Sequence, residues 1–238
     1  MNPAPTSNPI FVALDTTDLD YARQLAQRVR GSVGGLKLGL EFFSAHGPDG
    51  VRGFEGSGLP IFLDLKFHDI PNTVAGACRA AAQLGVSIMN VHAQGGAAMM
   101  RAAVDAARGI SPSTKVIAVT MLTSLSDEDL PSVGLMPPVA DQVLRLASLA
   151  QQCGLDGVVC SAHEIVRLRD ELGPDFLLVV PGIRPAGAAV GDQRRVMGPA
   201  EACNAGADIL VIGRPITGAP DPALAARDIA QSLGVSVA

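Results

Sequence analysis

Short apolar runs alternate along this chain with alanine-rich segments in which apolar residues recur at helical spacing. Short runs bounded by glycine, proline and polar residues predict buried strands, and the segments between them predict amphipathic helices. The predicted strands are Ile10–Asp15, Gly35–Gly39, Ile61–Lys66, Ser87–His92, Lys115–Thr120, Gly157–Cys160, Phe176–Val180 and Ile209–Gly213. The predicted helices are Leu19–Arg30, Val74–Leu84, Ala97–Arg108, Val139–Cys153, His163–Leu172 and Pro222–Leu233.

Eight strands that alternate with helices are the pattern of a (β/α)₈ barrel, or TIM barrel, with an open doubly wound sheet as the alternative. The chain has 238 residues, so we predict a single barrel domain over residues 1–238 with a flexible N-terminal tail at residues 1–9. Polar residues at the strand ends favour the barrel, because a closed barrel brings all these ends to one mouth. They are Asp15, Lys37, Asp64 with Lys66, His92, Thr120 with Thr123, Ser161 with His163, Arg184 and Arg214.

The composition, 48% hydrophobic and 17% charged residues, predicts a well-buried core rather than disorder. A formal charge of -5 without a cluster of Lys and Arg argues against nucleic acid and anionic membranes as partners. No apolar run approaches the length of a membrane span, and the N-terminal residues lack the pattern of a signal peptide. The four cysteines include no CxxC pair, which predicts free thiols in a reducing compartment and hence a cytoplasmic protein.

The segment from Ile61 to Phe67 predicts a buried strand that carries an acid and an amine. Side chains alternate between the two faces of a strand, so Asp64 and Lys66 are expected on the same face. Burying such a pair is costly, and a structural ion pair is the simplest reason for it. Asp69 and Thr73, which follow the strand end, favour a reaction site instead.

The last two predicted strands end in residues suited to a phosphate group. Gly213 allows close approach to the backbone, and Arg214 offers a guanidinium for charge-assisted hydrogen bonds. In (β/α)₈ barrels the loops after strands seven and eight are the usual phosphate site. The long loop from Pro185 to Gly198 is predicted to be a lid that closes over a ligand, from which Gln193 or an arginine could reach a phosphate.

The segment Asp64–Thr73 resembles the signature of the orotidine 5′-monophosphate decarboxylase family. Its Asp-x-Lys-x-x-Asp core is shared with sister enzymes that act on sugar phosphates, whereas the His-Asp-Ile-Pro-Asn-Thr extension is more specific to the decarboxylases. The resemblance covers almost the whole chain through the segments Val12–Asp15, Leu36–Gly39, Asn90–Ala93, Ala118–Ser124, Asp156–Ser161, Pro181–Arg184 and Ile212–Arg214.

The resemblance implies a barrel enzyme that converts orotidine 5′-monophosphate into uridine 5′-monophosphate and CO₂, without a cofactor or a bound metal. It implies that Lys66 is the proton donor, flanked by Asp64 and Asp69. Asp15 and Lys37 would bind the ribose hydroxyls.

The same resemblance implies the remaining substrate contacts and a homodimer. Thr123 would bind the pyrimidine edge, Pro181 would pack near the ring, and Arg184, Gln193, Gly213 and Arg214 would bind the phosphate or belong to the lid. Asp69, Ile70 and Thr73 would enter the site from the partner subunit, so that each active site is shared.

Three other functions are compatible with parts of this pattern. A Mg²⁺-dependent sugar-phosphate decarboxylase or synthase would need further acids near the barrel mouth, and Glu41 is the only obvious one. Schiff-base chemistry through Lys66 is disfavoured, since flanking carboxylates keep a lysine protonated. A catalytically inactive phosphate-ligand sensor would have no use for so costly a cluster of charges.

Overall fold

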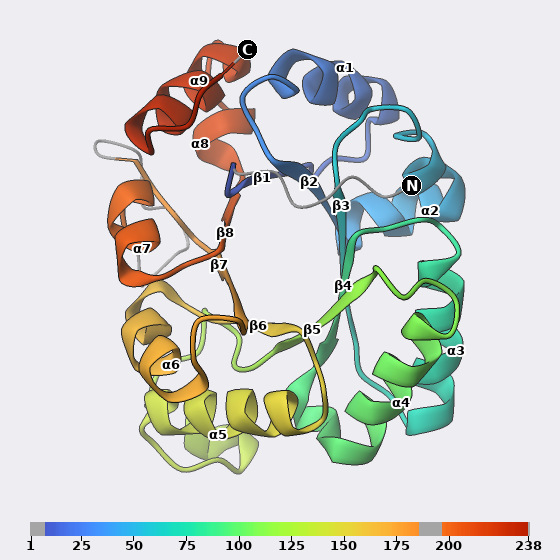
Figure 1. Cartoon of the computed structure of the whole chain (residues 1–238), viewed down its shortest axis with the longest axis vertical. Coiled ribbons are helices and arrows are strands. Elements are labelled where there is room, and N and C mark those ends of the chain that lie inside the picture. The colour runs from blue at the N-terminus through green and yellow to red at the C-terminus, as the bar shows by residue number, and fades with distance from the viewer. Residues whose placement is uncertain (1–7, 186–196, 238) are drawn as a thin grey trace.

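The computed structural model describes residues 8–185 and 197–237, and in it eight parallel strands form a closed barrel. Each strand pairs with the next, and the last pairs with the first, which confirms the predicted barrel and excludes an open sheet (Figure 1). The strands are β1 (Ile10–Ala13), β2 (Gly35–Gly39), β3 (Ile61–Phe67), β4 (Ile88–His92), β5 (Lys115–Val119), β6 (Gly157–Val159), β7 (Leu177–Pro181) and β8 (Ile209–Ile212).

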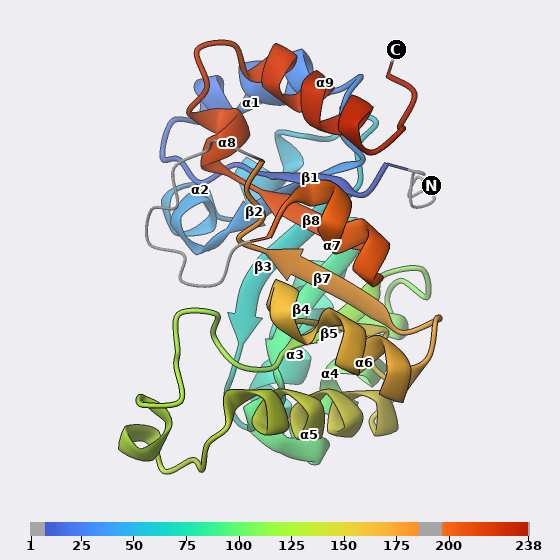
Figure 2. The ribbon, with the colours of Figure 1, turned by 90° about the vertical axis from the view of Figure 1, so that its left-hand side faces the viewer.

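Helices surround the barrel and cover the outer face of the strands (Figures 1 and 2). The α-helices are α1 (Leu19–Val29), α2 (Leu40–Arg52), α3 (Pro71–Ala82), α4 (Gly96–Arg108), α5 (Val139–Gln152), α6 (Ile165–Leu172), α7 (Pro199–Ala205), α8 (Arg214–Thr217) and α9 (Pro222–Ser232). Short 3₁₀ turns are η1 (Ala93–Gly95), η2 (Leu130–Val133) and η3 (Ala162–Glu164).

Each predicted helix is present, with ends shifted by a few residues, but α2, α7 and the short α8 lie outside the predicted ranges. In α2 the helical pattern is interrupted by Gly47, whose φ of 57° and ψ of -155° are not helical, and by Pro48 inside the helix. Glycine followed by proline is a strong turn signal, so the local pattern there indicates a loop rather than a helix. Helix α3 begins at Pro71, three residues earlier than predicted, because proline is well accommodated in a first helical turn.

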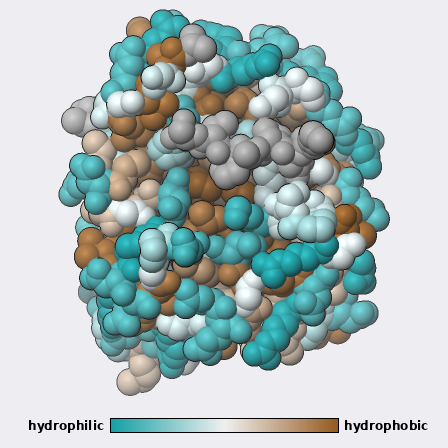
Figure 3. Space-filling model, in the orientation of Figure 1, coloured by the Kyte–Doolittle hydropathy of each residue, from teal (hydrophilic) through white to brown (hydrophobic). Residues whose placement is uncertain are grey.

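Two apolar layers fill the fold, one inside the barrel and one between the strands and the helices. The inner layer includes Phe11 and Phe62 together with Ile117. A Cβ atom at Gly35 would lie 2.4 Å from Cε1 of Phe11, so glycine is needed there to admit this ring. The outer layer contains residues such as Leu63, which is fully buried. Figure 3 shows hydrophilic residues around the margin of one face of the molecule and apolar residues nearer its centre.

The beginning and the end of the described chain meet where the barrel closes. Helices α1 and α9 lie side by side in both ribbon views, and Tyr21 Oη donates a hydrogen bond to the Thr217 carbonyl at 3.0 Å (Figures 1 and 2). Asn8 is buried, and its Nδ2 donates to the Ser32 carbonyl at 2.9 Å. The other residues of the predicted flexible tail, apart from Pro9, lie outside the described residues.

Two sequence expectations concern the surroundings of the protein. All four cysteines, Cys78, Cys153, Cys160 and Cys203, are free thiols, as predicted. Within residues 8–185 and 197–237, no helix is both long enough and apolar enough to cross a lipid bilayer.

Replacement of Gly157 by alanine should destabilise the barrel. A Cβ atom there would lie 2.3 Å from the Leu177 carbonyl oxygen on the neighbouring strand, so the backbone of β6 or β7 would have to move. We expect Gly157→Ala to lower the free energy of unfolding by about 1–3 kcal/mol, as other overpacked sites do. Urea denaturation monitored by circular dichroism measures this change.

Gly198→Ala is the matched control, because no atom of the described residues lies within 4 Å of a Cβ at Gly198 and its φ is -72°. This variant should change the free energy of unfolding by less than about 1 kcal/mol, because the reduced entropy of the unfolded chain opposes the weaker N-cap that alanine provides for α7. Equal stability of the two variants would contradict the packing argument.

Candidate active site

A cavity of about 410 Å³ opens at the carboxyl ends of the strands. Residues from β1, β2, β3, β7 and β8, or from the loops directly after them, line it, so strands distant in sequence contribute to one site. The predicted site residues in its lining are Asp15, Lys37, Asp64, Pro181, Arg184, Gly213 and Arg214.

Four side chains of alternating charge, those of Asp15, Lys37, Asp64 and Lys66, lie next to one another at this mouth. Lys37 Nζ lies 2.6 Å from Asp15 Oδ1 and 3.6 Å from Asp64 Oδ2. The second oxygen of Asp64, Oδ1, lies 2.7 Å from Lys66 Nζ. The side chains of Lys37 and Asp64 are only 8% and 13% exposed, so each buried charge is compensated by neighbours of opposite sign.

The pKa of Asp64 reflects this environment. Burial alone raises the pKa of a carboxyl group, but the charges of Lys66 and Lys37 and the hydrogen bonds from Lys66 and Asn90 outweigh it. The pKa of Asp64 therefore lies below its ordinary value, and the group is ionised at neutral pH.

The backbone of β3 is distorted where it carries Lys66. Among the described residues Lys66 is the only one other than glycine with a positive φ, at 53°. Such a left-handed conformation costs an L-residue roughly 1–2 kcal/mol. The pairing of β3 with β4 also shifts register between Leu63 and Phe67. Lys66 still meets Asp64 on one face of the strand, in agreement with the alternation predicted from the sequence.

Gly39 provides the space for the pair of Lys37 and Asp15. A Cβ atom at Gly39 would lie 2.7 Å from Lys37 Nζ and 3.0 Å from Asp15 Oδ1. Sequence reasoning gave Gly39 no role. The signal was its position two residues after Lys37 in the same strand, which places it on the same face.

Lys66 does not line the cavity itself but pairs with Asp64, which does. Three further predicted residues lie away from the cavity within one chain. Asp69, Ile70 and Thr73 lie after β3 and in the first turn of α3, and all three are exposed, Ile70 at 67%. Asp69 Oδ1 accepts a hydrogen bond from the backbone N–H of Ile70 at 2.7 Å. In the part of the chain that the structure describes, no ion pair joins Asp69 to Lys66.

The remaining predictions are placed as follows. Thr123 is half-buried in the loop after β5 and does not line the cavity. The backbone N–H of Arg184 donates to the Met197 carbonyl at 3.0 Å, which joins the two ends of the predicted lid. Gln193 lies outside the described residues.

Two histidines lie near the charged side chains of Asp64 and Lys66. The rings of His68 and His92 are stacked, with 5.4 Å between their centroids. Burial, followed by the charges of His68 and Lys66, lowers the pKa of His92 to about 4, and Asp64 only partly opposes this. His92 is therefore neutral at pH 7.

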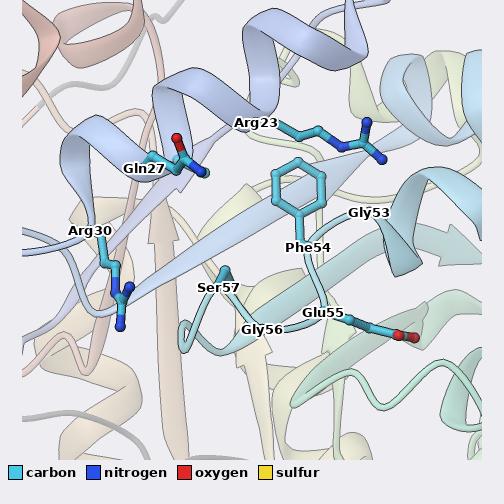
Figure 4. A pocket seen from close by; sticks show the side chains of 9 residues that line it. Arg23, Gln27, Arg30, Gly53, Phe54, Glu55, Gly56 and Ser57 are labelled. Atoms are coloured by element: carbon cyan, nitrogen blue, oxygen red, sulfur yellow. The ribbon is translucent and has the colours of Figure 1, made fainter.

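A second pocket, of about 220 Å³, lies between α1 and the turn that follows α2 (Figure 4). Arg23 and Gln27 of α1, with Arg30 directly after it, face Phe54 and Ser57 across the pocket. The turn leads into the start of β3, so this pocket is at the amino-terminal end of the barrel. It contains no predicted site residue, and conserved features at that end of barrels usually concern stability.

Comparison with known proteins identifies the family. The sequence model described as the Orotidine 5'-phosphate decarboxylase / HUMPS family matches residues 8–229. The chain belongs to this family. The orotidine 5'-phosphate decarboxylase of Rhodospirillum rubrum is 58% identical over 232 residues, which cover 94% of each chain. That of Paramagnetospirillum magneticum is 55% identical over 234 residues, covering 96% of this chain and 99% of the relative.

A solved structure agrees with these sequence relatives. The crystal structure of orotidine 5'-phosphate decarboxylase from Lactobacillus acidophilus superposes with a TM-score of 0.83 at 39% identity. The match covers 96% of this chain and 100% of that one. The family resemblance stated from the motifs is therefore confirmed over nearly the whole barrel.

The lowered pKa of His92 predicts how stability depends on pH in this family member. The folded-state pKa, about 4, is below the ordinary value of 6.5, so the unfolded chain binds a proton more readily. This difference has no effect above pH 6.5 and removes stability as the pH falls from there toward 4. Because the ring is partly exposed, we expect a loss of about 1 kcal/mol rather than the full value of the shift.

The free energy of unfolding of His92→Gln should therefore fall less than that of the wild type when the pH is lowered from about 7.5 to about 5. These two values lie roughly one pH unit either side of the ordinary pKa of histidine. Urea unfolding at both pH values measures this. His163→Gln, at an exposed position, is the control and should behave as the wild type. An unchanged loss in His92→Gln would show that other groups carry the pH dependence.

Proposed function

We propose that this protein decarboxylates orotidine 5′-monophosphate to uridine 5′-monophosphate and CO₂ in pyrimidine biosynthesis, with Lys66 as the proton donor. The observation that carries the proposal is the contact of 2.7 Å between Lys66 Nζ and an ionised Asp64 at the barrel mouth. The proposal is supported by relatives that are 55% and 58% identical and are named orotidine 5'-phosphate decarboxylase.

In the proposed reaction the bond between C6 of the pyrimidine and its carboxylate breaks, and the electron pair stays on C6. The carboxylate leaves as CO₂, and a proton from Lys66 forms the new C6–H bond, after which solvent reprotonates the lysine. The attraction between the ammonium group and C6 grows as negative charge develops, so it stabilises the transition state more than the bound substrate. The contact of 2.7 Å with Asp64 would hold the Lys66 side chain in place.

The rest of the substrate would be bound by groups around the same cavity. Arg214 and Gly213 after β8, and Arg184 after β7, line it where (β/α)₈ barrels usually hold phosphate. Asp15 and Lys37 would bind the ribose hydroxyls.

The pyrimidine base of the substrate would lie between these groups and the charged side chains of Asp64 and Lys66. Pro181, which lines the cavity, would pack near the pyrimidine ring. Thr123 would bind the pyrimidine edge and Gln193 would reach the phosphate when the lid closes. Binding energy from the remote phosphate would then orient the reacting ring.

We also propose a homodimer in which the partner supplies Asp69, Ile70 and Thr73 to each site. Within one chain these three residues are exposed, and Asp69 does not pair with Lys66 in the described structure. An apolar side chain as exposed as that of Ile70, at 67%, suits burial against a second copy. Free thiols at all four cysteines suit a reducing, cytoplasmic location.

Lys66→Ala should abolish the reaction without abolishing binding of the product nucleotide. Loss of the proton donor and of its electrostatic stabilisation should reduce kcat by at least about 10³-fold. The change in ultraviolet absorbance of orotidine 5′-monophosphate measures turnover, and calorimetry measures the binding of uridine 5′-monophosphate. Lys115→Ala, at the start of β5, is the control and should retain full activity.

Wild-type turnover should persist in excess EDTA. Loss of turnover in the chelator, restored by Mg²⁺, would favour a metal-dependent relative on the same barrel. Retained turnover in Lys66→Ala would refute the role of this lysine.

Mixing two inactive variants tests the shared site. A mixed dimer of Lys66→Ala and Asp69→Ala chains would contain one site with Lys66 from one chain and Asp69 from the other. With random exchange of equal amounts, about a quarter of the wild-type activity should return. Native mass spectrometry confirms that subunits have exchanged, and no recovery in an exchanged sample would mean that each site uses its own Asp69.

A further inference from the structure

Asn90 is the one residue of β4 that contacts both ends of the Asp64–Lys66 segment. It lies in the middle of the strand and is fully buried. Its Nδ2 donates a hydrogen bond to Asp64 Oδ1 at 2.7 Å, and its Oδ1 accepts one from the backbone N–H of Lys66 at 2.8 Å. One amide thus binds the carboxylate that pairs with the lysine and the backbone that carries the lysine.

The register of the two strands explains why this amide is needed. Leu63 pairs with Met89 and Phe67 pairs with Val91, so four residue steps in β3 face two in β4. Strand β3 therefore bulges over Asp64, Leu65 and Lys66, and Asn90 alone stands opposite the bulge. Bulges beside active sites redirect a side chain, at the cost of ladder hydrogen bonds.

The side chain of Asn90 replaces the missing backbone partner. Lys66 has a left-handed φ of 53°, a conformation that persists only where surrounding contacts determine it. The bond from Lys66 N–H to Asn90 Oδ1 is such a contact, and an unpaired N–H at this depth would be unfavourable.

We propose that Asn90 is a positioning residue, which holds the β3 bulge so that the Lys66 ammonium stays against Asp64 and is aimed at the reacting carbon. The inference rests on the proposed function for its catalytic consequence, but its geometric part is independent of the reaction. Asn90 would act through Lys66 and Asp64 rather than by touching the substrate, because its side chain is fully buried and its amide oxygen and nitrogen both bind β3.

The test compares Asn90→Ala and Asn90→Ser with a control at another buried polar residue. Thr114→Val removes the hydrogen bond of a buried hydroxyl to the Val86 carbonyl, just before the amino-terminal end of β5. We expect kcat to fall about 100-fold in Asn90→Ala and about tenfold in Asn90→Ser, the range seen for groups that support a catalytic residue. Affinity for uridine 5′-monophosphate should stay within about threefold in all variants, because the phosphate and ribose groups are untouched. Thr114→Val should keep the wild-type kcat.

Hydrogen exchange of the Lys66 amide supplies a readout that does not depend on turnover. It should accelerate at least about tenfold in both Asn90 variants and stay unchanged in Thr114→Val, whereas the Leu63 amide should be unaffected throughout. A wild-type kcat in folded Asn90→Ala or Asn90→Ser, or an unchanged Lys66 amide, would overturn the proposal. Wild-type protein without decarboxylase activity would refute the proposed function instead, and exchange alone would then decide the positioning role.

Discussion

The carboxylate of Asp64 is the charge on which the rest of the site depends. Two ammonium groups, of Lys37 and Lys66, and the amide of Asn90 all converge on its two oxygens. Without this negative charge Lys37 and Lys66 would lose the group that links them. A single carboxylate therefore sets the geometry of its neighbours.

The apolar interior of the barrel strengthens these interactions. Phe62, two residues before Asp64, and Phe11 belong to the buried apolar cluster inside the barrel. Charge pairs next to such apolar packing interact more strongly than they would in bulk water. The same strand thus supplies the apolar packing and, at its end, two charged groups, which explains why β3 reads as a hydrophobic run interrupted by an acid and a lysine.

The sequence predicted those features that depend on short-range pattern. Strand positions follow from local apolar runs, and Asp64 meets Lys66 because residues two apart share a strand face. The role of Asn90 could not be predicted, since it arises from a register shift between two strands, which is a long-range property. Helix α2 was missed because Gly47 and Pro48 imitate a turn. Asp69 and Ile70 cannot be placed from one chain if their partners belong to another.

The pairing of β1 with β8 has a consequence during synthesis of the protein. Asp15 follows the first strand and Arg214 follows the last, yet both line one cavity. A nascent chain that has not yet released β8 from the ribosome lacks one wall of that cavity, however well its earlier strands have paired. Such a chain has neither a closed sheet nor a complete cavity, so the site is complete only after β8 has paired with both β1 and β7.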